Sequence, residues 1–157
     1  MTGKGGSRTG KPAPGPGRIA IVVATRPDEV AKVAAALDTL AARCRLPADA
    51  VADMQVALDE ILANAVTHGA SAGGAREVRV AVTVRPDALE AEVADDGAPF
   101  DPLTAAEPDR ESPLEHRRMG GLGIHFVRSV MSELRYRRVG RRNVLVLRKL
   151  LHGGPGS

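Results

Sequence analysis

Apolar and polar positions along the first half of the chain predict one strand followed by two helices. The segment Arg18–Thr25 is apolar and rich in β-branched residues and is closed by Pro27, which is typical of a strand. From Asp28 to Cys44 apolar residues recur at helical spacing, so an amphipathic helix is expected there. A second helix is predicted from Ala48 to His68, with Gly69 as its stop.

A hairpin and a long irregular segment are expected next. Apolar and polar residues alternate in Arg76–Arg85 and Leu89–Ala94, and the Pro86-Asp87 pair between them marks a turn. From Asp95 to Gly123 the alternation is lost, and several prolines interrupt a polar stretch. Connections this long in a compact domain are usually functional lids or disordered. We therefore expect a lid here.

The chain is expected to close with a short helix and a second hairpin. Ile124–Met131 has the pattern of a helix that follows a glycine loop, and strands are predicted at Glu133–Arg138 and Asn143–Leu150, with the turn at Gly140. The order β, α, α, β, β, lid, α, β, β predicts an α+β fold. Its helices should pack on one face of a mixed, mainly antiparallel sheet.

Length and composition indicate a single domain with flexible ends. The chain has 157 residues, of which 43% are apolar, enough for one core and too few for two ordinary domains. Residues 1–17 are rich in glycine, proline and basic residues and are expected to form a disordered head. The domain should span residues 18–151, and residues 152–157 should form a flexible tail.

Charge, aromatic content and cysteine content narrow the class of function. The net charge of +3 comes from the two ends of the chain, and the few aromatic residues disfavour base stacking, so no nucleic-acid partner is expected. Cys44 is the single cysteine, which is typical of a reducing compartment. No apolar run is long enough to span a membrane and no secretory signal is evident, so we expect a cytoplasmic protein without a membrane partner.

A polar row on the second predicted helix is the first candidate for chemistry. Glu60, Asn64 and His68 are spaced four residues apart and therefore share one flank of the helix. The Asn64 amide oxygen could ligate Mg²⁺, and Glu60 could orient or deprotonate a nucleophile. His68 could contact phosphate or simply interact with the last carbonyls of the helix. By itself the row could equally be a solvated polar stripe.

An acidic turn after the predicted strand Leu89–Ala94 is the second candidate. Asp95 and Asp96 are followed by Gly97, which allows the backbone to approach a ligand closely. A carboxylate in a partly apolar pocket can accept a hydrogen bond from an exocyclic amine such as that of adenine. The alternative is an ordinary Asp-Gly turn.

A glycine-rich run before the last predicted helix is the third candidate. Gly120, Gly121, Leu122 and Gly123 lead into this helix, so free backbone amides and the positive helix end could bind phosphates. A glycine hinge would fit the same residues. In the preceding lid, basic side chains could reach a phosphate or an acidic partner, or could be solvated: His116, Arg117 and Arg118.

The closing hairpin carries a second set of basic residues. The arginines alternate along it, and exposed charge that protects a strand edge from aggregation is the default interpretation. They are Arg135, Arg137, Arg138, Arg141 and Arg142.

Taken in order, these motifs resemble the Bergerat-fold (GHKL) ATP-binding superfamily, which includes histidine kinases and type II topoisomerases. Within it, Asn64–His68 (NAVTH), Asp95–Pro102 (DDGAPFDP) and Gly120–Val127 (GGLGIHFV) are similar to the small, stand-alone anti-sigma-factor serine kinases. The resemblance covers residues 19–150 and implies a two-layer α/β sandwich with an ATP lid. It also implies ATP and Mg²⁺ as cofactors.

The resemblance assigns roles by position. Asn64 matches the Mg²⁺ ligand, Glu60 the general base, and Asp95, with Gly97 beside it, the carboxylate that binds adenine. Gly121 and Gly123 match the glycines of the phosphate loop, which also includes Gly120 and Leu122.

Two positions depart from the superfamily pattern. Pro99 stands where many members have the second glycine of Asp-x-Gly-x-Gly, as in the anti-sigma branch, and it stiffens the entry to the lid. Many members also place a Thr or Ser on a late strand near the adenine, whereas Asn143–Leu147 offers no hydroxyl. The water network around the base is therefore expected to differ.

The function implied is a Mg·ATP-dependent serine/threonine protein kinase that acts as an anti-sigma factor. Such a protein would phosphorylate a small anti-anti-sigma partner, sequester a sigma factor by partner switching, and form a homodimer. The alternative is a non-catalytic ATP-gated binding module, which would not require a carboxylate at Glu60. A histidine-kinase catalytic domain fits less well, because the chain has no phosphoacceptor helix pair.

Overall fold

The computed structural model describes residues 17–69, 74, 76–104 and 121–151. The predicted tail and the predicted head lie outside the described residues, apart from Gly17, whose carbonyl accepts a hydrogen bond from the Val84 N–H at 2.8 Å. Also outside are Gly120, His116, Arg117 and Arg118. For His68, Gly69, Gly121 and Leu122 only the backbone is described.

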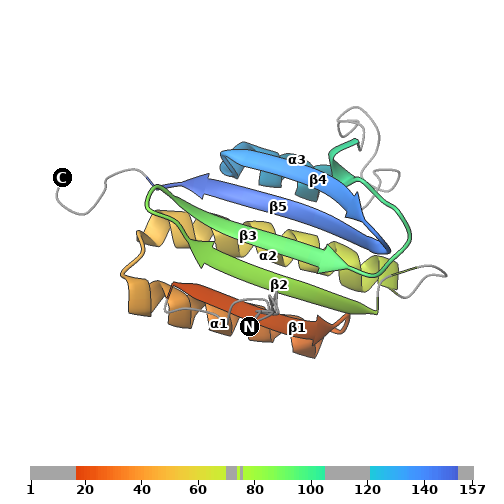
Figure 1. Cartoon of the computed structure of the whole chain (residues 1–157), viewed down its shortest axis with the longest axis horizontal. Helices are drawn as coiled ribbons and strands as arrows, with labels where there is room; N and C mark the ends of the chain where they lie inside the picture. The colour runs from red at the N-terminus through yellow and green to blue at the C-terminus, as the bar shows by residue number, and fades with distance from the viewer. Residues whose placement is uncertain (1–16, 70–73, 75, 105–120, 152–157) are drawn as a thin grey trace, which may run out of the picture.

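Five strands form one sheet in the order β1-β2-β3-β5-β4 (Figure 1). They are β1 (Arg18–Ala24), β2 (Glu77–Val84), β3 (Ala88–Asp95), β4 (Glu133–Val139) and β5 (Arg142–Leu150). Every pairing between them is antiparallel. The predicted α+β fold is thus confirmed, and the described sheet is antiparallel throughout rather than mixed.

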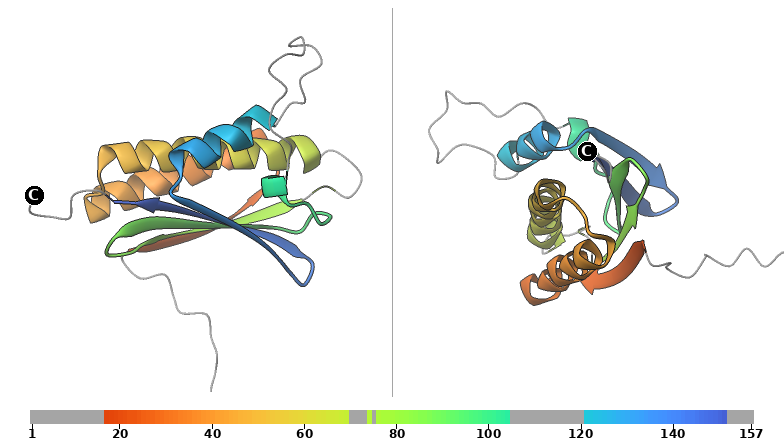
Figure 2. Two further views of the ribbon diagram at one scale, coloured as in Figure 1. Left: turned by 90° about the horizontal axis from the view of Figure 1, so that it is seen from above. Right: turned by 90° about the vertical axis from the view of Figure 1, so that its left-hand side faces the viewer.

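Three helices cover one face of the sheet, which gives the expected two layers (Figure 2). They are α1 (Pro27–Cys44), α2 (Ala48–Gly69) and α3 (Gly121–Val130), and a short 3₁₀ turn, η1, spans Pro102–Thr104. Side chains that alternate along the strands meet the apolar stripes of α1 and α2. The largest fully buried members of this core include Leu37, Leu40, Met54, Leu58, Leu62, Leu89 and Leu147. Burial of each such side chain contributes about 1.5–3 kcal/mol.

The start of α3 corrects the sequence prediction. The helix begins at Gly121 and not at Ile124, so Gly121 and Gly123 belong to its first turn and do not form a loop before it. Glycine lowers helix propensity, which explains the later predicted start. The first-turn N–H groups of a helix have no intrahelical partner, however, so they remain available to a ligand as expected. The turn between β4 and β5 agrees with the prediction, since Gly140 has φ of +57°.

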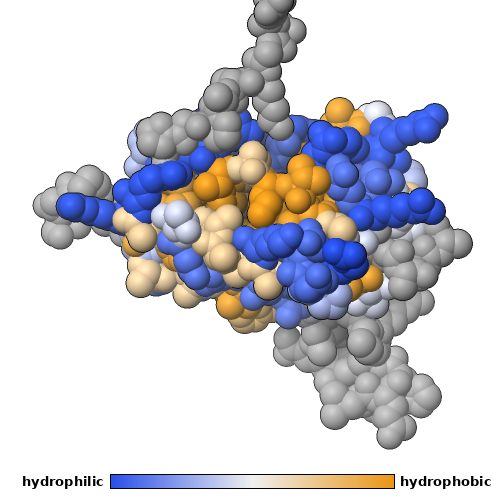
Figure 3. Space-filling view, turned by 90° about the horizontal axis from the view of Figure 1, so that it is seen from below, coloured by the Kyte–Doolittle hydropathy of each residue, from blue (hydrophilic) through white to orange (hydrophobic). Residues whose placement is uncertain are grey.

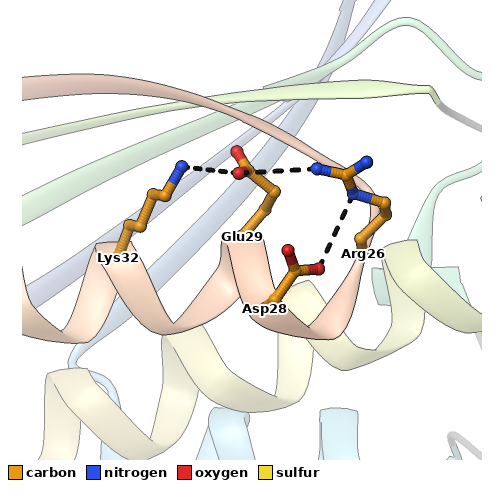
Figure 4. A network of polar contacts seen from close by, with 4 residues as sticks. All are labelled: Arg26, Asp28, Glu29 and Lys32. Atoms are coloured by element: carbon orange, nitrogen blue, oxygen red, sulfur yellow. Dashed lines mark hydrogen bonds and ion pairs between the residues drawn. The ribbon is translucent and has the colours of Figure 1, made fainter.

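Charged residues mark the beginning of α1 (Figure 4). Arg26 is the N-cap and lies 3.6 Å from Asp28 and from Glu29, while the Lys32 ammonium donates to Glu29 at 2.5 Å. Acidic residues in the first turn complement the helix dipole, and Pro27 fits the N1 position. The hydrogen bond from Lys32 lowers the pKa of Glu29. Arg26, Asp28 and Lys32 are exposed, so solvent screens these ion pairs and they contribute little to the stability of the fold.

Lys149, near the end of β5, connects the sheet to two helices. Its ammonium donates to the Val130 carbonyl at the end of α3 at 2.8 Å and pairs with Asp53 of α2, also at 2.8 Å. Side-chain exposure is 19% for Lys149 and 35% for Asp53, so solvent screens this pair only partly. The contact holds α3 beside α2.

The edge of the sheet at β1 exposes apolar surface. Seen from the side of β1 and α1, apolar residues gather near the middle of the face among hydrophilic ones (Figure 3). Val22 of β1 is 55% exposed. Among the described helices, none combines the length and the apolar character needed to cross a membrane.

Candidate nucleotide-binding site

The three predicted motifs lie at one end of the molecule. The C-terminal half of α2, the end of β3 and the first turn of α3 all lie in the right half of Figure 1, and α2 contacts both α3 and β3. Because α3 runs back along α2, its N-terminus lies near the part of α2 that carries Glu60 and Asn64. The fold therefore brings together motifs that are far apart in the sequence.

Glu60 and Gly123 are in direct contact. A Cβ built on Gly123 would collide with the Oε2 atom of Glu60 and would lie 3.3 Å from its Cδ. The Glu60 carboxylate thus lies against the first turn of α3, where backbone N–H groups lack intrahelical partners. The partial positive charge of a helix N-terminus favours anions at this point. Partial burial raises the pKa of the preceding residue, Asp59.

Asn64 follows Glu60 by one turn of α2 and is half-buried. It has no hydrogen-bond partner among the described residues, so its amide oxygen remains available. The same part of the chain contains no cluster of three or more His, Cys, Asp or Glu residues that could hold a metal. A Mg²⁺ ion here would rely on one protein ligand together with phosphate and water oxygens, which is a common arrangement for this ion.

The acidic turn is fixed at both carboxylates. The Gly97 N–H donates to Oδ1 of Asp95 at 2.9 Å. Asp96 accepts from the backbone N–H groups of Arg76 at 2.9 Å and Glu77 at 3.2 Å, which ties the turn to the start of β2. Burial opposes ionisation of Asp96, but these backbone donors outweigh it and lower the pKa of Asp96 below its ordinary value.

Asn143 belongs to this site and was not predicted from the sequence. It is 6% exposed and lies directly opposite Asp95 in the pairing of β3 with β5. Its Nδ2 donates to Oδ1 of Asp95 at 2.9 Å and to the Ala98 carbonyl at 2.8 Å. The sequence did contain a signal for this residue, because Asn143 directly precedes the apolar run Val144–Leu147. A polar amide in a buried strand is unusual unless it is hydrogen-bonded.

Arg138 corrects the interpretation of the basic hairpin. Its guanidinium donates to the Gly97 carbonyl at 2.8 Å and to Oδ1 of Asn143 at 3.1 Å, so it supports the acidic turn. Arg135 and Arg137, in contrast, pair with Glu133 and Glu92 on the exposed surface, as expected of solvated strand charges.

A separate open groove of about 260 Å³ lies beyond the site, at the other end of α3. None of the predicted site residues lines it. Its lining residues are Leu103, Arg128, Met131, Ser132, Glu133 and Leu134.

Comparison with known proteins agrees with this geometry. Residues 23–149 match the sequence family described as the histidine kinase-like ATPase domain. The chain belongs to this family. The match runs from the end of β1 to near the end of β5 and includes every described residue of the candidate site. ATP binding is the property common to this ATPase family and to the predicted site.

Curated proteins similar to this chain include protein kinases. The serine-protein kinase RsbW of Listeria monocytogenes is 26% identical over 122 residues, covering 75% of this chain and 78% of that protein. RsbW of Bacillus licheniformis is 31% identical over 116 residues, covering 70% and 71%. The serine/threonine-protein kinase BtrW of Bordetella bronchiseptica is 29% identical over 121 residues, covering 77% and 84%.

A solved structure shows the same fold. The structure of the RsbU and RsbW domains of a Mycobacterium tuberculosis protein superposes with a TM-score of 0.60 at 20% identity, over 87% of this chain. This chain spans 33% of that longer one. Together with the RsbW relatives, these matches confirm the resemblance to anti-sigma-factor serine kinases within the GHKL superfamily.

Proposed function

We propose that this chain is a Mg·ATP-dependent serine/threonine protein kinase that acts as an anti-sigma regulatory factor. The observation that carries the proposal is the Glu60 carboxylate held against Gly123 in the first turn of α3. In this proposal the Glu60 carboxylate is the proton acceptor, and the backbone donors beside it are suited to phosphate. Relatives named as serine-protein kinases support the same activity.

The described residues offer chemical groups that could bind each part of Mg·ATP: the phosphates, the metal and the base. The backbone N–H groups of Gly121, Leu122 and Gly123 would bind phosphate oxygens, and the missing side chain at Gly123 leaves room beside Glu60. Asn64 would supply an amide oxygen to Mg²⁺. The carboxylate of Asp95 would accept a hydrogen bond from the exocyclic amine of adenine. When bound, Mg²⁺ neutralises charge on the phosphates.

In the proposed mechanism, Glu60 orients the serine or threonine hydroxyl of the substrate and accepts its proton as the oxygen bonds to the γ-phosphorus of ATP. The bond from that phosphorus to the bridging oxygen breaks, and ADP leaves. The backbone donors of the first turn of α3 stabilise negative charge on the transferred group. The Asp95 turn holds the base, so it fixes the position of the nucleotide relative to Glu60. Positioning and charge stabilisation account for most of the catalysis in phosphoryl transfer.

The substrate proposed is a small anti-anti-sigma protein, and a sigma factor would be bound when that substrate is absent or phosphorylated. The kinase would be cytoplasmic and homodimeric. The exposed apolar surface at the β1 edge supports a protein contact there (Figure 3). Equilibrium sedimentation tests the dimer, and a monomer throughout the micromolar range would contradict it.

A non-catalytic ATP-gated binding module is the second candidate. In that case nucleotide binding would alter partner affinity without turnover. The position of Glu60 favours the kinase, because a binding module has no need of a carboxylate beside the phosphate-binding amides.

The deciding experiment measures transfer of label from γ-³²P-ATP to candidate anti-anti-sigma proteins. We expect Glu60→Gln to bind ATP like the parent and to slow transfer by about 10²–10⁴-fold, which is typical for loss of a general base. The matched control is Glu92→Gln, since Glu92 is exposed on β3 and pairs only with Arg137 among the described residues. Transfer undiminished in Glu60→Gln removes Glu60 from the mechanism. Absence of transfer from the parent chain, combined with nucleotide-dependent complex formation, supports the binding module instead.

A further inference from the structure

The geometry points to Asn143 as a positioning residue that orients Asp95 for recognition of the purine base. This inference rests on the proposed function, in which Asp95 accepts a hydrogen bond from the adenine amine. Asn143 lies on β5 and would not touch the nucleotide, but through Asp95 it would determine how strongly the site prefers a base that carries an exocyclic amine.

The orientation of the Asn143 amide is determined by its partners. Oδ1 accepts from three donors: the Phe100 N–H at 3.0 Å, the Tyr136 hydroxyl at 2.6 Å and the Arg138 guanidinium at 3.1 Å. Backbone N–H and guanidinium groups can only donate, so the oxygen must face them. The Nδ2 group must then face Asp95 and the Ala98 carbonyl, both of which are acceptors. Flipping the amide would place donors against donors.

This arrangement determines which oxygen of Asp95 is free. Oδ1 accepts from the Gly97 N–H and from Nδ2 of Asn143, both at 2.9 Å. Its two donors come from opposite sides, one from the turn itself and one from the neighbouring strand. Oδ2 has no hydrogen-bond partner among the described residues. Asn143 therefore fixes the rotamer of Asp95 and leaves Oδ2 to accept from a ligand amine.

The same amide makes the whole turn rigid. Through Asn143 and Arg138, residues 97, 98 and 100 are all connected to the β4–β5 hairpin by hydrogen bonds. Asn143 is 6% exposed, so water cannot readily replace these bonds when the side chain is shortened. Loss of the amide should release Asp95 while the strands stay paired, because the backbone ladder between β3 and β5 does not use side chains.

The test compares two nucleotides that differ only in the amine. The full chain is titrated with ATP and with purine riboside triphosphate, which lacks the exocyclic amine, and the ratio of the two Kd values is measured. Asn143→Ser should weaken ATP binding by about tenfold, the effect of one or two hydrogen bonds, and leave the purine riboside nucleotide nearly unchanged. In an Asp95→Asn background the same substitution should not change the ratio. Arg137→Gln, on the same hairpin but outside the network, is the matched control.

A second variant covers the case in which Asn143→Ser does not fold. Tyr136→Phe removes one donor to Asn143 and keeps the aromatic ring, so it should lower the ratio in the same direction by about threefold. Equal weakening of both nucleotides, or an unchanged ratio in folded Asn143→Ser or Tyr136→Phe, would overturn the positioning role. If the parent chain does not bind ATP, or if Asp95→Asn keeps the full ratio, the site assigned under the proposed function fails and this inference fails with it.

Discussion

Gly123 lies so close to the Glu60 side chain that one methyl group added at position 123 would not fit beside the carboxylate. A Cβ on Gly123 would collide with Oε2 of Glu60 and would lie within van der Waals distance of its Cγ, at 3.8 Å. The atoms that it would meet are the mobile end of a side chain and not backbone. A small side chain at position 123 would therefore move the Glu60 carboxylate and leave the fold in place.

This contact predicts that Gly123→Ala separates stability from activity. Alanine is favoured over glycine inside a helix by about 0.5–1 kcal/mol, so the free energy of unfolding should be unchanged or slightly higher. Phosphotransfer should fall by at least about tenfold, because a displacement of a catalytic group by 1 Å is costly. Urea unfolding and label transfer from ATP measure the two effects. A loss of stability that accompanies the loss of transfer would contradict this explanation.

The double variant Gly123→Ala with Glu60→Ala provides the control for that prediction. Removing the Glu60 carboxylate removes the collision, so the alanine at position 123 should then have no further effect on ATP affinity. An ATP affinity much weaker in the double variant than in Glu60→Ala alone would show that the methyl group obstructs the nucleotide directly.

Asn64→Ala should abolish the Mg²⁺ dependence of ATP binding. Asn64 is the proposed protein ligand of the metal, and no cluster of acidic, His or Cys residues in the described part of the chain could replace it. The ATP affinity of the variant in Mg²⁺ should match that of the parent chain in EDTA, as measured by calorimetric titration. Thr67→Ala is the control, since Thr67 is exposed on the same helix and its hydroxyl bonds, within the described part of the chain, only to the Ala63 carbonyl. A Mg²⁺ effect of parental size in Asn64→Ala would refute the metal role.

Sequence patterns were sufficient to predict the elements and the three motifs, because both follow from local spacing. The periods of helix and strand located α1 and α2 to within about two residues of their observed ends. The four-residue spacing of Glu60 and Asn64 placed both on one flank of a helix. The contact between Glu60 and Gly123 could not be predicted in this way, since it depends on how closely α3 packs against α2.

Three further features required the tertiary structure. Glycine is a poor helix former, so propensity placed the start of α3 too late, whereas the close approach of Glu60 of α2 leaves no room for a side chain at Gly123. Arg138 sits among arginines that are exposed, and its sequence neighbours do not reveal its contact with the Gly97 carbonyl. The role of Asn143 likewise depends on its register opposite Asp95. Side chains that act across a sheet are visible only once strand order and register are known.

The acidic turn predicts a pH-dependent contribution to stability from Asp96. Backbone donors from Arg76 and Glu77 outweigh the cost of burial and hold the pKa of Asp96 below its ordinary value of 3.8 in the folded chain. The ionised form is therefore stabilised by folding, and this contribution is present above pH 3.8 and is lost as the pH falls through the folded pKa. Asp96→Asn should lower the free energy of unfolding near neutral pH by less than about 1 kcal/mol, since the group is exposed and screened. The difference from the parent chain should shrink as the pH falls below 3.8 and through the folded pKa in urea unfolding series. A difference of constant size across that range would show that the charge of Asp96 has no part in it.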